Sequence, residues 1–160
     1  MDQIERLMAA EEIRQLKARY FRCMDTKDWA GFEQVFATDA VMDMSTEIGD
    51  RAGQGSGITR GAAEIASMVR NVVGAVVTVH HGHMPEIEIT SPTTARGVWA
   101  MEDKLRWPEG SSVRTMHGYG HYHETYERTE QGWRIKTITL TRLRVDTELT
   151  RRVERDRPAG

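Results

Sequence analysis

The chain has 160 residues, and its 22 lysines and arginines nearly balance 24 aspartates and glutamates, for a formal net charge of −2 at pH 7. That balance offers no basic surface to attract nucleic acid, and the length suits one domain with its own core. No apolar run approaches the ~20 residues of a membrane helix, and residues 1–14 are charged throughout instead of forming an apolar signal segment. We therefore expect a cytoplasmic protein without membrane or nucleic-acid partners.

A long amphipathic helix is predicted at the start of the chain. Asp2 and Glu5 have the spacing of a capping box, and apolar residues then recur at steps of three and four as far as Met24. The single cysteine, Cys23, lies in this helix beside Phe21. It has no partner for an internal disulfide, and we interpret it as a small buried residue and not as a nucleophile.

Further helices, a strand and a loop are predicted before residue 75. A second helix should start at residues 26–28 and give way to a short strand over residues 40–44. Residues 49–57 hold four glycines and are expected to form a loop. Thr59 then has the side chain to cap a helix that continues to about Asn71. The inward-facing residues of the second helix are expected to be Phe32, Val35 and Phe36.

From residue 75 onward the sequence favours strands. Four segments are rich in Val, Ile, Thr, Trp and Tyr, and turn signals separate them: Ser91-Pro92, Pro108-Glu109-Gly110 and Glu130-Gln131-Gly132. They are typical of an antiparallel meander of long strands. Because the helices come first and the strands follow, we expect an α+β fold in which a strongly bent sheet wraps around the helices. Residues 1–149 should form one domain, and residues 150–160 a basic, solvated tail.

Two charged side chains interrupt apolar faces of the predicted strands. Asp103 shares its face with apolar residues, and Arg142 shares its face with Ile138 and Leu140. A charge removed from water needs a partner, so an ion pair between Asp103 and Arg142 would satisfy both. From the strand pattern alone, a purely structural salt bridge and a catalytic role stay equally open. The apolar residues beside Asp103 are Trp99, Met101, Leu105 and Trp107.

The first long strand carries three histidines, side chains suited to exchange protons near neutrality because their ordinary pKa is ~6.5. One of them is a candidate general base. Strict alternation places His81 and His83 on the apolar face of the strand and His80 on the other, but a bulge at Gly82 or Pro85 would reverse this. The strand pattern therefore does not select among them.

Tyr20 and Asp25 lie near the end of the first predicted helix. A phenol can donate a hydrogen bond, and a carboxylate can hold an imidazole in one tautomer. Five positions on an unbroken helix differ by ~140°, so both side chains reach one pocket only if the helix ends before Asp25. Taken singly, Tyr20 is better explained as a core aromatic residue and Asp25 as a helix-end residue.

A second group of histidines, on a later strand, has the same parity as His81 and His83, which raises the question of a metal site. No paired carboxylate accompanies these residues, so we interpret them as exposed strand histidines and expect no bound metal. The group consists of His117, His121 and His123.

Several motifs follow one another over most of the chain: Lys17-Ala-Arg-Tyr-Phe-Arg-Cys-Met-Asp25 followed by Trp29, His80-His-Gly-His83-Met-Pro-Glu-Ile, Thr93-Thr-Ala-Arg-Gly-Val-Trp99 with Glu102-Asp103-Lys-Leu, and Tyr126-Glu with Gly132-Trp133 and Arg142. In this order they resemble the motifs of SnoaL-like proteins with the nuclear transport factor two fold. Within that family they resemble the bile-acid 7α-dehydratases in particular, which are related to scytalone dehydratase. The resemblance implies a cone-shaped, cystatin-like α+β barrel with its helices packed in a strongly bent sheet.

The resemblance also implies the site. It selects His80 over His81, so a bulge in the first long strand is expected, and it implies that neither a metal nor a cofactor takes part. The loop over residues 49–57 is longer and richer in glycine than in the bile-acid enzymes, so the likeness leaves the substrate open. The implied catalytic residues are Tyr20, Asp25, His80, Asp103 and Arg142, and the implied pocket residues are Trp99, Met101, Leu105, His83 and Tyr126.

The implied activity is that of a carbon–oxygen lyase, a dehydratase acting on a steroid-like or polycyclic substrate. His80, oriented by Asp25, would take a proton and return it to the leaving hydroxyl, while Tyr20 supports the developing oxyanion. Asp103 and Arg142 would position the polar end of the substrate. A polyketide cyclase or ketosteroid-type isomerase would use the same groups, and a noncatalytic dioxygenase β-type subunit or ligand-binding module shares the fold. The exposed sheet face of this fold implies a homodimer or homotrimer.

Overall fold

The computed structural model describes residues 1–45 and 57–150 of the chain. All but the last residue of the loop predicted over residues 49–57, and all but the first residue of the tail predicted over residues 150–160, lie outside them. None of the described helices is long and apolar enough to cross a membrane.

Helix α1 (Gln3–Asp25) opens the chain with the capping box expected from the sequence. The Asp2 carboxylate accepts a hydrogen bond of 2.8 Å from the backbone N–H of Glu5, and the Glu5 carboxylate accepts one of 2.7 Å from the N–H of Asp2. A short helix α2 (Trp29–Glu33) follows, with Asp28 as its N-cap. The predicted order of two helices is confirmed.

Phe32, Val35 and Phe36 are buried as expected, and the strand predicted over residues 40–44 is present, but the helix ends earlier and the strand begins earlier than predicted. Phe36 lies beyond α2 and begins strand β1 (Phe36–Asp43), where its partner across the sheet is Ile135. The backbone N–H of Ile135 also donates to the carbonyl of Val35 at 2.9 Å. Pairing with a distant strand therefore overrides the local helical pattern.

The predicted start of the third helix is also wrong. Thr59 lies in a short strand, β2 (Ile58–Arg60), and pairs with Met42 of β1, so it caps no helix. Helix α4 (Ala62–Val73) begins only after Gly61, whose φ of 93° turns the chain into the helix without a side-chain cap.

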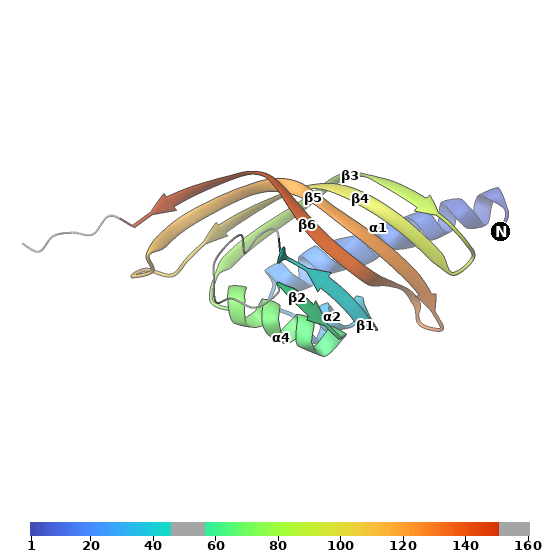
Figure 1. Ribbon diagram of the computed structural model, residues 1–160, viewed down its shortest axis with the longest axis horizontal. Helices are drawn as coiled ribbons and strands as arrows, with labels where there is room; N and C mark the ends of the chain where they lie inside the picture. The colour runs from blue at the N-terminus through green and yellow to red at the C-terminus, as the bar shows by residue number, and fades with distance from the viewer. Residues whose placement is uncertain (46–56, 151–160) are drawn as a thin grey trace, which may run out of the picture.

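The predicted antiparallel meander is confirmed. Strands β3 (Val77–Ile89), β4 (Thr94–Arg106), β5 (Val113–Thr129) and β6 (Gly132–Leu149) pair in chain order. Strand β1 joins β6 in parallel and carries β2 at the edge, so the sheet is mixed, with the order β2-β1-β6-β5-β4-β3. Figure 1 shows the long strands curving over α1, with α2 and α4 on the same side. The expected α+β fold, with helices packed in a bent sheet, is confirmed.

The bulge expected in β3 is present. The register between β3 and β4 shifts between Gly82 and Pro85. Before the shift His80 is buried against the core, and after it Ile89 is, so the inward face changes from even to odd residue numbers. His80 therefore faces the core, whereas His81 is exposed on the outer face of the sheet.

The core lies between the helices and the inner face of the sheet. Helix α1 packs mainly against β3, and strand β6 supplies apolar side chains from the other side. This packing places the carboxyl end of α1 beside the part of β3 that precedes the bulge. The apolar residues that are no more than 1% exposed are Ile13, Leu16, Phe32, Ile65, Ile135, Ile138 and Leu140, together with Ala40.

Replacing Ile138 with alanine should lower the free energy of unfolding by ~2–5 kcal/mol, because the deletion leaves a cavity in the core. Val79→Ala is the control, since Val79 is 42% exposed on the outer face and its loss should cost less than about 1 kcal/mol. Urea denaturation followed by circular dichroism measures both. Equal losses would contradict the assignment of the two sheet faces.

Candidate active site

The end of helix α1 brings Asp25 to strand β3. Asp25 is the last residue of the helix and Thr26 is its C-cap, so the helix does not end before Asp25 as the sequence argument for a pocket shared with Tyr20 required. Oδ1 of Asp25 lies 2.6 Å from Nδ1 of His80, and Oδ2 accepts a hydrogen bond of 2.9 Å from the backbone N–H of His80. The hydroxyl of Thr78 donates to Oδ1 at 2.9 Å. Together these donors fix the position of the carboxylate.

The same contacts keep Asp25 charged. Burial by itself would raise the pKa of Asp25, but the hydrogen bonds from the ring and backbone of His80, with that from Thr78, hold it below its ordinary value. A carboxylate at Nδ1 favours the tautomer with its proton there and leaves Nε2 as the basic nitrogen. Asp25 and His80 thus form a dyad whose Nε2 is suited to accept a proton.

The ring of His80 is packed against Phe21. The two rings are nearly parallel, with 14° between their planes and 6.2 Å between their centroids. Phe21 in turn fills the space next to Gly82, where a Cβ atom would lie 2.6 Å from its ring. The missing side chain at Gly82 therefore allows Phe21 to pack against the imidazole.

Tyr20 is buried in a cluster of aromatic rings. Its ring meets those of Phe21 and Tyr122 edge-on, with centroids 5.4 and 5.9 Å apart. Burial raises the pKa of Tyr20 well above its ordinary value, and the nearby Tyr122, Glu124 and Asp103, together with a hydrogen bond from Tyr20 to Tyr122, add to the rise. The phenol is therefore protonated at neutral pH and can act as a hydrogen-bond donor.

The ion pair expected between Asp103 and Arg142 is present. Nη1 of Arg142 donates to Oδ1 of Asp103 at 3.0 Å, and Nη2 donates to Oδ2 at 2.7 Å. The side chains of Asp103 and Arg142 are 5% and 15% exposed, so two parallel hydrogen bonds satisfy a nearly buried carboxylate. Asp103 is also the partner of His80 across the β3–β4 ladder. The pair and the dyad therefore lie on the same inner face.

A glycine gives this pair its space. Gly118 stands opposite Asp103 in the β4–β5 ladder. A Cβ atom at Gly118 would lie 2.3 Å from Oδ1 of Asp103 and 2.3 Å from Nη1 of Arg142. A side chain at this position would force the end of Asp103 or of Arg142 to shift from its observed place.

Gly118→Ala should therefore displace Asp103 or Arg142 and lower the free energy of unfolding, by less than the ~3–5 kcal/mol that removing one partner of a buried ion pair costs, because both side chains can shift. In a chain that already carries Asp103→Ala and Arg142→Ala, the same change should cost far less, because the methyl group then has room. Urea denaturation of the four chains measures this coupling. Equal costs in the two backgrounds would mean that the pair is not what Gly118 accommodates.

A buried ion pair joins Lys17 and Glu124, neither of which is among the site residues predicted from the sequence. Nζ of Lys17 bonds to one carboxylate oxygen, the hydroxyl of Tyr126 donates to the other, and both charged side chains are 0% exposed. Burial lowers the pKa of Lys17 to about 8 even though Glu124 favours its charged form. The sequence does indicate that Lys17 is buried, because it lies four residues after Ile13 and three before Tyr20, on the apolar stripe of α1.

Met101 and Leu105, two of the implied pocket residues, are buried on the inner face of β4. Sδ of Met101 lies 3.6 Å from Nη1 of Arg142, so this side chain borders the ion pair.

The other implied pocket residues lie elsewhere. Trp99 is buried, and its Nε1 donates to the hydroxyl of Tyr126 at 2.8 Å, which joins both residues to Glu124. His83 lies beyond the start of the bulge, and its side chain is 57% exposed near Glu102. The structure does not bring His83 to the dyad.

The remaining histidines surround Glu102 or line the same outer face of the sheet. Nε2 of His117 lies 2.8 Å from Oε2 of Glu102, and Nδ1 of His81 lies 3.4 Å from Oε1. In the part of the chain that the structure describes, no group of three or more His, Cys, Asp or Glu residues is arranged to hold a metal ion. The histidines on this face are His81, His83, His117, His121 and His123.

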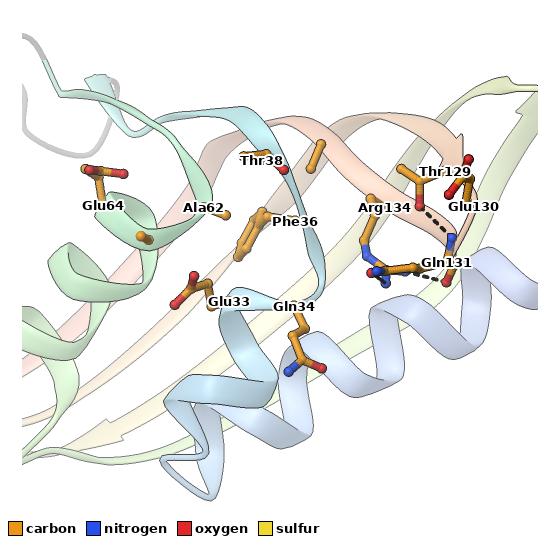
Figure 2. A pocket seen from close by; sticks show the side chains of 12 residues that line it. Glu33, Gln34, Phe36, Thr38, Ala62, Glu64, Thr129, Glu130, Gln131 and Arg134 are labelled. Atoms are coloured by element: carbon orange, nitrogen blue, oxygen red, sulfur yellow. Dashed lines mark hydrogen bonds between the residues drawn. The ribbon is translucent and has the colours of Figure 1, made fainter.

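A hollow of about 530 Å³ lies among α2, α4, β1 and the turn from β5 to β6 (Figure 2). Its wall carries Glu33, Glu64, Glu130 and Arg134, and Arg134 donates to the backbone and side-chain oxygens of Gln131. None of the five catalytic candidates lines this hollow. It is therefore separate from the dyad.

Acid should weaken the fold partly through Asp25. Its pKa is lower in the folded chain than the ~3.9 of an unfolded chain, so its stabilising contribution is complete above that value and is lost as the pH falls below it. Asp25→Asn should consequently lose less free energy of unfolding than the wild type when the pH is lowered from about 6 to about 3. Urea titrations at several pH values measure this, and the other acidic groups cancel in the comparison. An equal loss would exclude the stabilising contacts of Asp25.

Comparison with known proteins identifies the fold and the family. The SnoaL-like domain matches residues 5–139. Among curated proteins, the probable cyclase FGR4 of Gibberella zeae is 24% identical over 143 residues, which cover 84% of this chain and 91% of that protein.

Among solved structures, hexachlorocyclohexane dehydrochlorinase LinA type 2 has a TM-score of 0.77 at 17% identity, over 92% of this chain and 93% of LinA. A candidate scytalone dehydratase from Novosphingobium aromaticivorans has a TM-score of 0.75 at 16% identity, over 91% of each chain. At these identities the structural similarity establishes a shared fold.

Proposed function

The chain belongs to the SnoaL-like domain family, and we propose that within it this protein is a dehydratase that needs no cofactor. Its substrate is a steroid-like or polycyclic compound whose carbonyl group is conjugated toward the carbon that bears the leaving hydroxyl. The observation that carries the proposal is the Asp25–His80 dyad, with the buried Tyr20 connected to it through Phe21, whose ring contacts both Tyr20 and His80. A base and a hydrogen-bond donor are the two groups that elimination next to a carbonyl requires.

His80 acts first in the proposed reaction. Its Nε2 removes the proton of the acidified C–H bond, and the electron pair of that bond moves toward the carbonyl, which becomes an enolate. Asp25 stabilises the imidazolium and keeps the ring oriented. Tyr20 donates a hydrogen bond to the oxygen while it carries negative charge. The enolate then expels the hydroxyl group, which takes the proton back from Nε2 and leaves as water.

Asp103 and Arg142 bind the polar end of the substrate in this proposal. Asp103 pairs with His80 across the strands, so the guanidinium lies on the same face as the imidazole. Two hydrogen bonds to Asp103 orient Arg142 before the substrate arrives. Met101 and Leu105, on the same inner face of β4, supply apolar surface for flat rings.

A cyclase is the second candidate, and the similarity to the probable cyclase FGR4 favours it. Cyclisation of a polyketide, like a ketosteroid-type isomerisation, uses a base and an oxyanion donor but releases no hydroxyl group. A noncatalytic subunit or ligand-binding module is less well supported, because the inner face carries a carboxylate–imidazole dyad and a nearly buried ion pair that a simple binding surface does not need.

The test is incubation of the purified protein with 3-oxo-4-ene steroids and with bile-acid thioesters that carry a 7-hydroxyl group. Loss of water extends the conjugated system, so ultraviolet absorbance should move to longer wavelength, and mass spectrometry should show the loss of one water. His80→Ala should abolish the reaction. Tyr20→Phe should lower kcat by roughly 10²–10³-fold, the usual cost of losing one oxyanion donor.

His123→Ala is the matched control, because His123 lies on the outer face of the sheet, where its ring contacts Thr141 at 3.1 Å. It should react as fast as the wild type. Binding of these compounds without any absorbance change would favour the cyclase. Full activity of His80→Ala would contradict the dyad as the base.

A further inference from the structure

We propose that Lys17 is a positioning residue that fixes the ring of Tyr20 in the site, through an ammonium group held by Glu124. The inference rests on the role of Tyr20 in the proposed function. Lys17 touches no reacting atom in this scheme and acts only through the phenol.

The ammonium of Lys17 lies against three aromatic rings. Nζ is 3.9 Å from the ring centroid of Tyr20, 3.7 Å from that of Tyr122 and 4.8 Å from that of Phe21. A cation over a ring face is attracted by the negative charge of the π system, and the attraction is strongest where water is excluded. The side chain of Lys17 is 0% exposed, so these contacts form in a dry environment. They determine where the rings of Tyr20 and Tyr122 can lie.

Glu124 keeps the ammonium in place. Its carboxylate accepts from Lys17 on one oxygen and from the hydroxyl of Tyr126 on the other. The hydroxyl of Tyr126 accepts in turn from Nε1 of Trp99 at 2.8 Å. This chain of hydrogen bonds connects α1 to β5 and β4, next to the helical turn that carries Tyr20. The ring of Tyr20 is thus connected to strand β5 through Lys17 and Glu124, in addition to its attachment to helix α1.

A purely structural explanation accounts poorly for this arrangement. Removing an ammonium and a carboxylate from water is costly, and an apolar pair of similar volume often stabilises a core as well or better. Phe21, one of the rings against Lys17, also packs against His80. The buried cation therefore lies where it contacts both the proposed donor and the residue that supports the proposed base.

The arrangement makes the site sensitive to alkaline pH. The pKa of Lys17 is lowered to about 8 by burial, so the ammonium loses its proton as the pH rises through that value. The groups that face it are Tyr20 and Phe21 from α1 and Tyr122 and Glu124 from β5, with Tyr126 behind Glu124. Neutral Lys17 no longer attracts the ring faces and leaves Glu124 without a countercharge. We expect kcat to fall above about pH 8.

The test compares the wild type with Lys17→Met/Glu124→Gln. This double variant removes both charges together, so no unpaired charge is left in the core, and the amide oxygen that replaces the carboxylate can still accept from Tyr126. The control is Lys136→Met/Glu127→Gln, which removes a lysine–glutamate pair of 3.0 Å between β5 and β6 whose side chains are 34% exposed. Circular dichroism and urea denaturation first establish that each chain folds.

Two measurements decide the proposal. The double variant should lower kcat by roughly 10–100-fold with KM changed less than about threefold, and its fall in kcat above pH 8 should disappear. The second measurement does not depend on activity. In nuclear magnetic resonance of ¹³C-labelled tyrosine, the chemical shift of Tyr20 should change as Lys17 loses its proton, with a midpoint near pH 8 in the wild type and in the control. In Lys17→Met/Glu124→Gln that transition should be absent.

The outcomes separate this inference from the proposed function. Wild-type kcat and an unchanged pH profile in the folded double variant would overturn the positioning role. If the wild type dehydrates none of the compounds, the proposed function fails, and the tyrosine spectrum alone decides the inference. A Tyr20 signal that titrates near pH 8 only when Lys17 is present would then support it, and a signal that does not titrate there would overturn it.

Discussion

One carboxylate joins the helical and the sheet parts of the site. Asp25, the last residue of α1, bonds to both the ring and the backbone of His80 in β3, which fixes the end of the helix relative to the strand. The helix contributes Tyr20 on the preceding turns, and the strand places His80 opposite Asp103. A longer helix or an unbulged strand would turn these side chains in different directions. The contact therefore sets where the base lies relative to the end of the helix.

The parts of the fold that depend on local patterns were accessible from the sequence. The capping box marks the start of α1, and turn residues bound each strand of the meander. The strand predicted over residues 40–44 is part of β1, but the start of β1 and the whole of β2 were not accessible, because β1 begins where its parallel pairing with β6 begins, at Phe36 and Ile135. Phe36 pairs with Ile135 and Thr59 with Met42, partners that lie outside the local sequence pattern, which favours a helix at Phe36 and a helix cap at Thr59 instead.

The same division applies to the site. The pairing of Asp103 with Arg142 could be predicted because each charge interrupts an apolar strand face, and two such charges of opposite sign need each other. Strict alternation favours the neighbour of His80, and only the family resemblance selects His80, because the bulge that turns it inward depends on the conformation of the strand. Lys17 is recognisable as a charge on an apolar stripe, but its partner Glu124 is 107 positions away, on a strand where the sequence pattern does not identify the inward face.

The glycines opposite these side chains have a consequence for the transfer of the site to other proteins. Gly82 leaves the volume that Phe21 occupies beside His80, and Gly118 leaves the volume that the guanidinium of Arg142 occupies. A designer who grafts only the polar residues onto another scaffold of this shape would find those volumes filled by ordinary strand side chains. A search for unrelated sequences with the same chemistry meets the same obstacle if it asks only for acids, bases and a phenol. Glycine at positions 82 and 118 is therefore as much a requirement of this site as the polar side chains themselves.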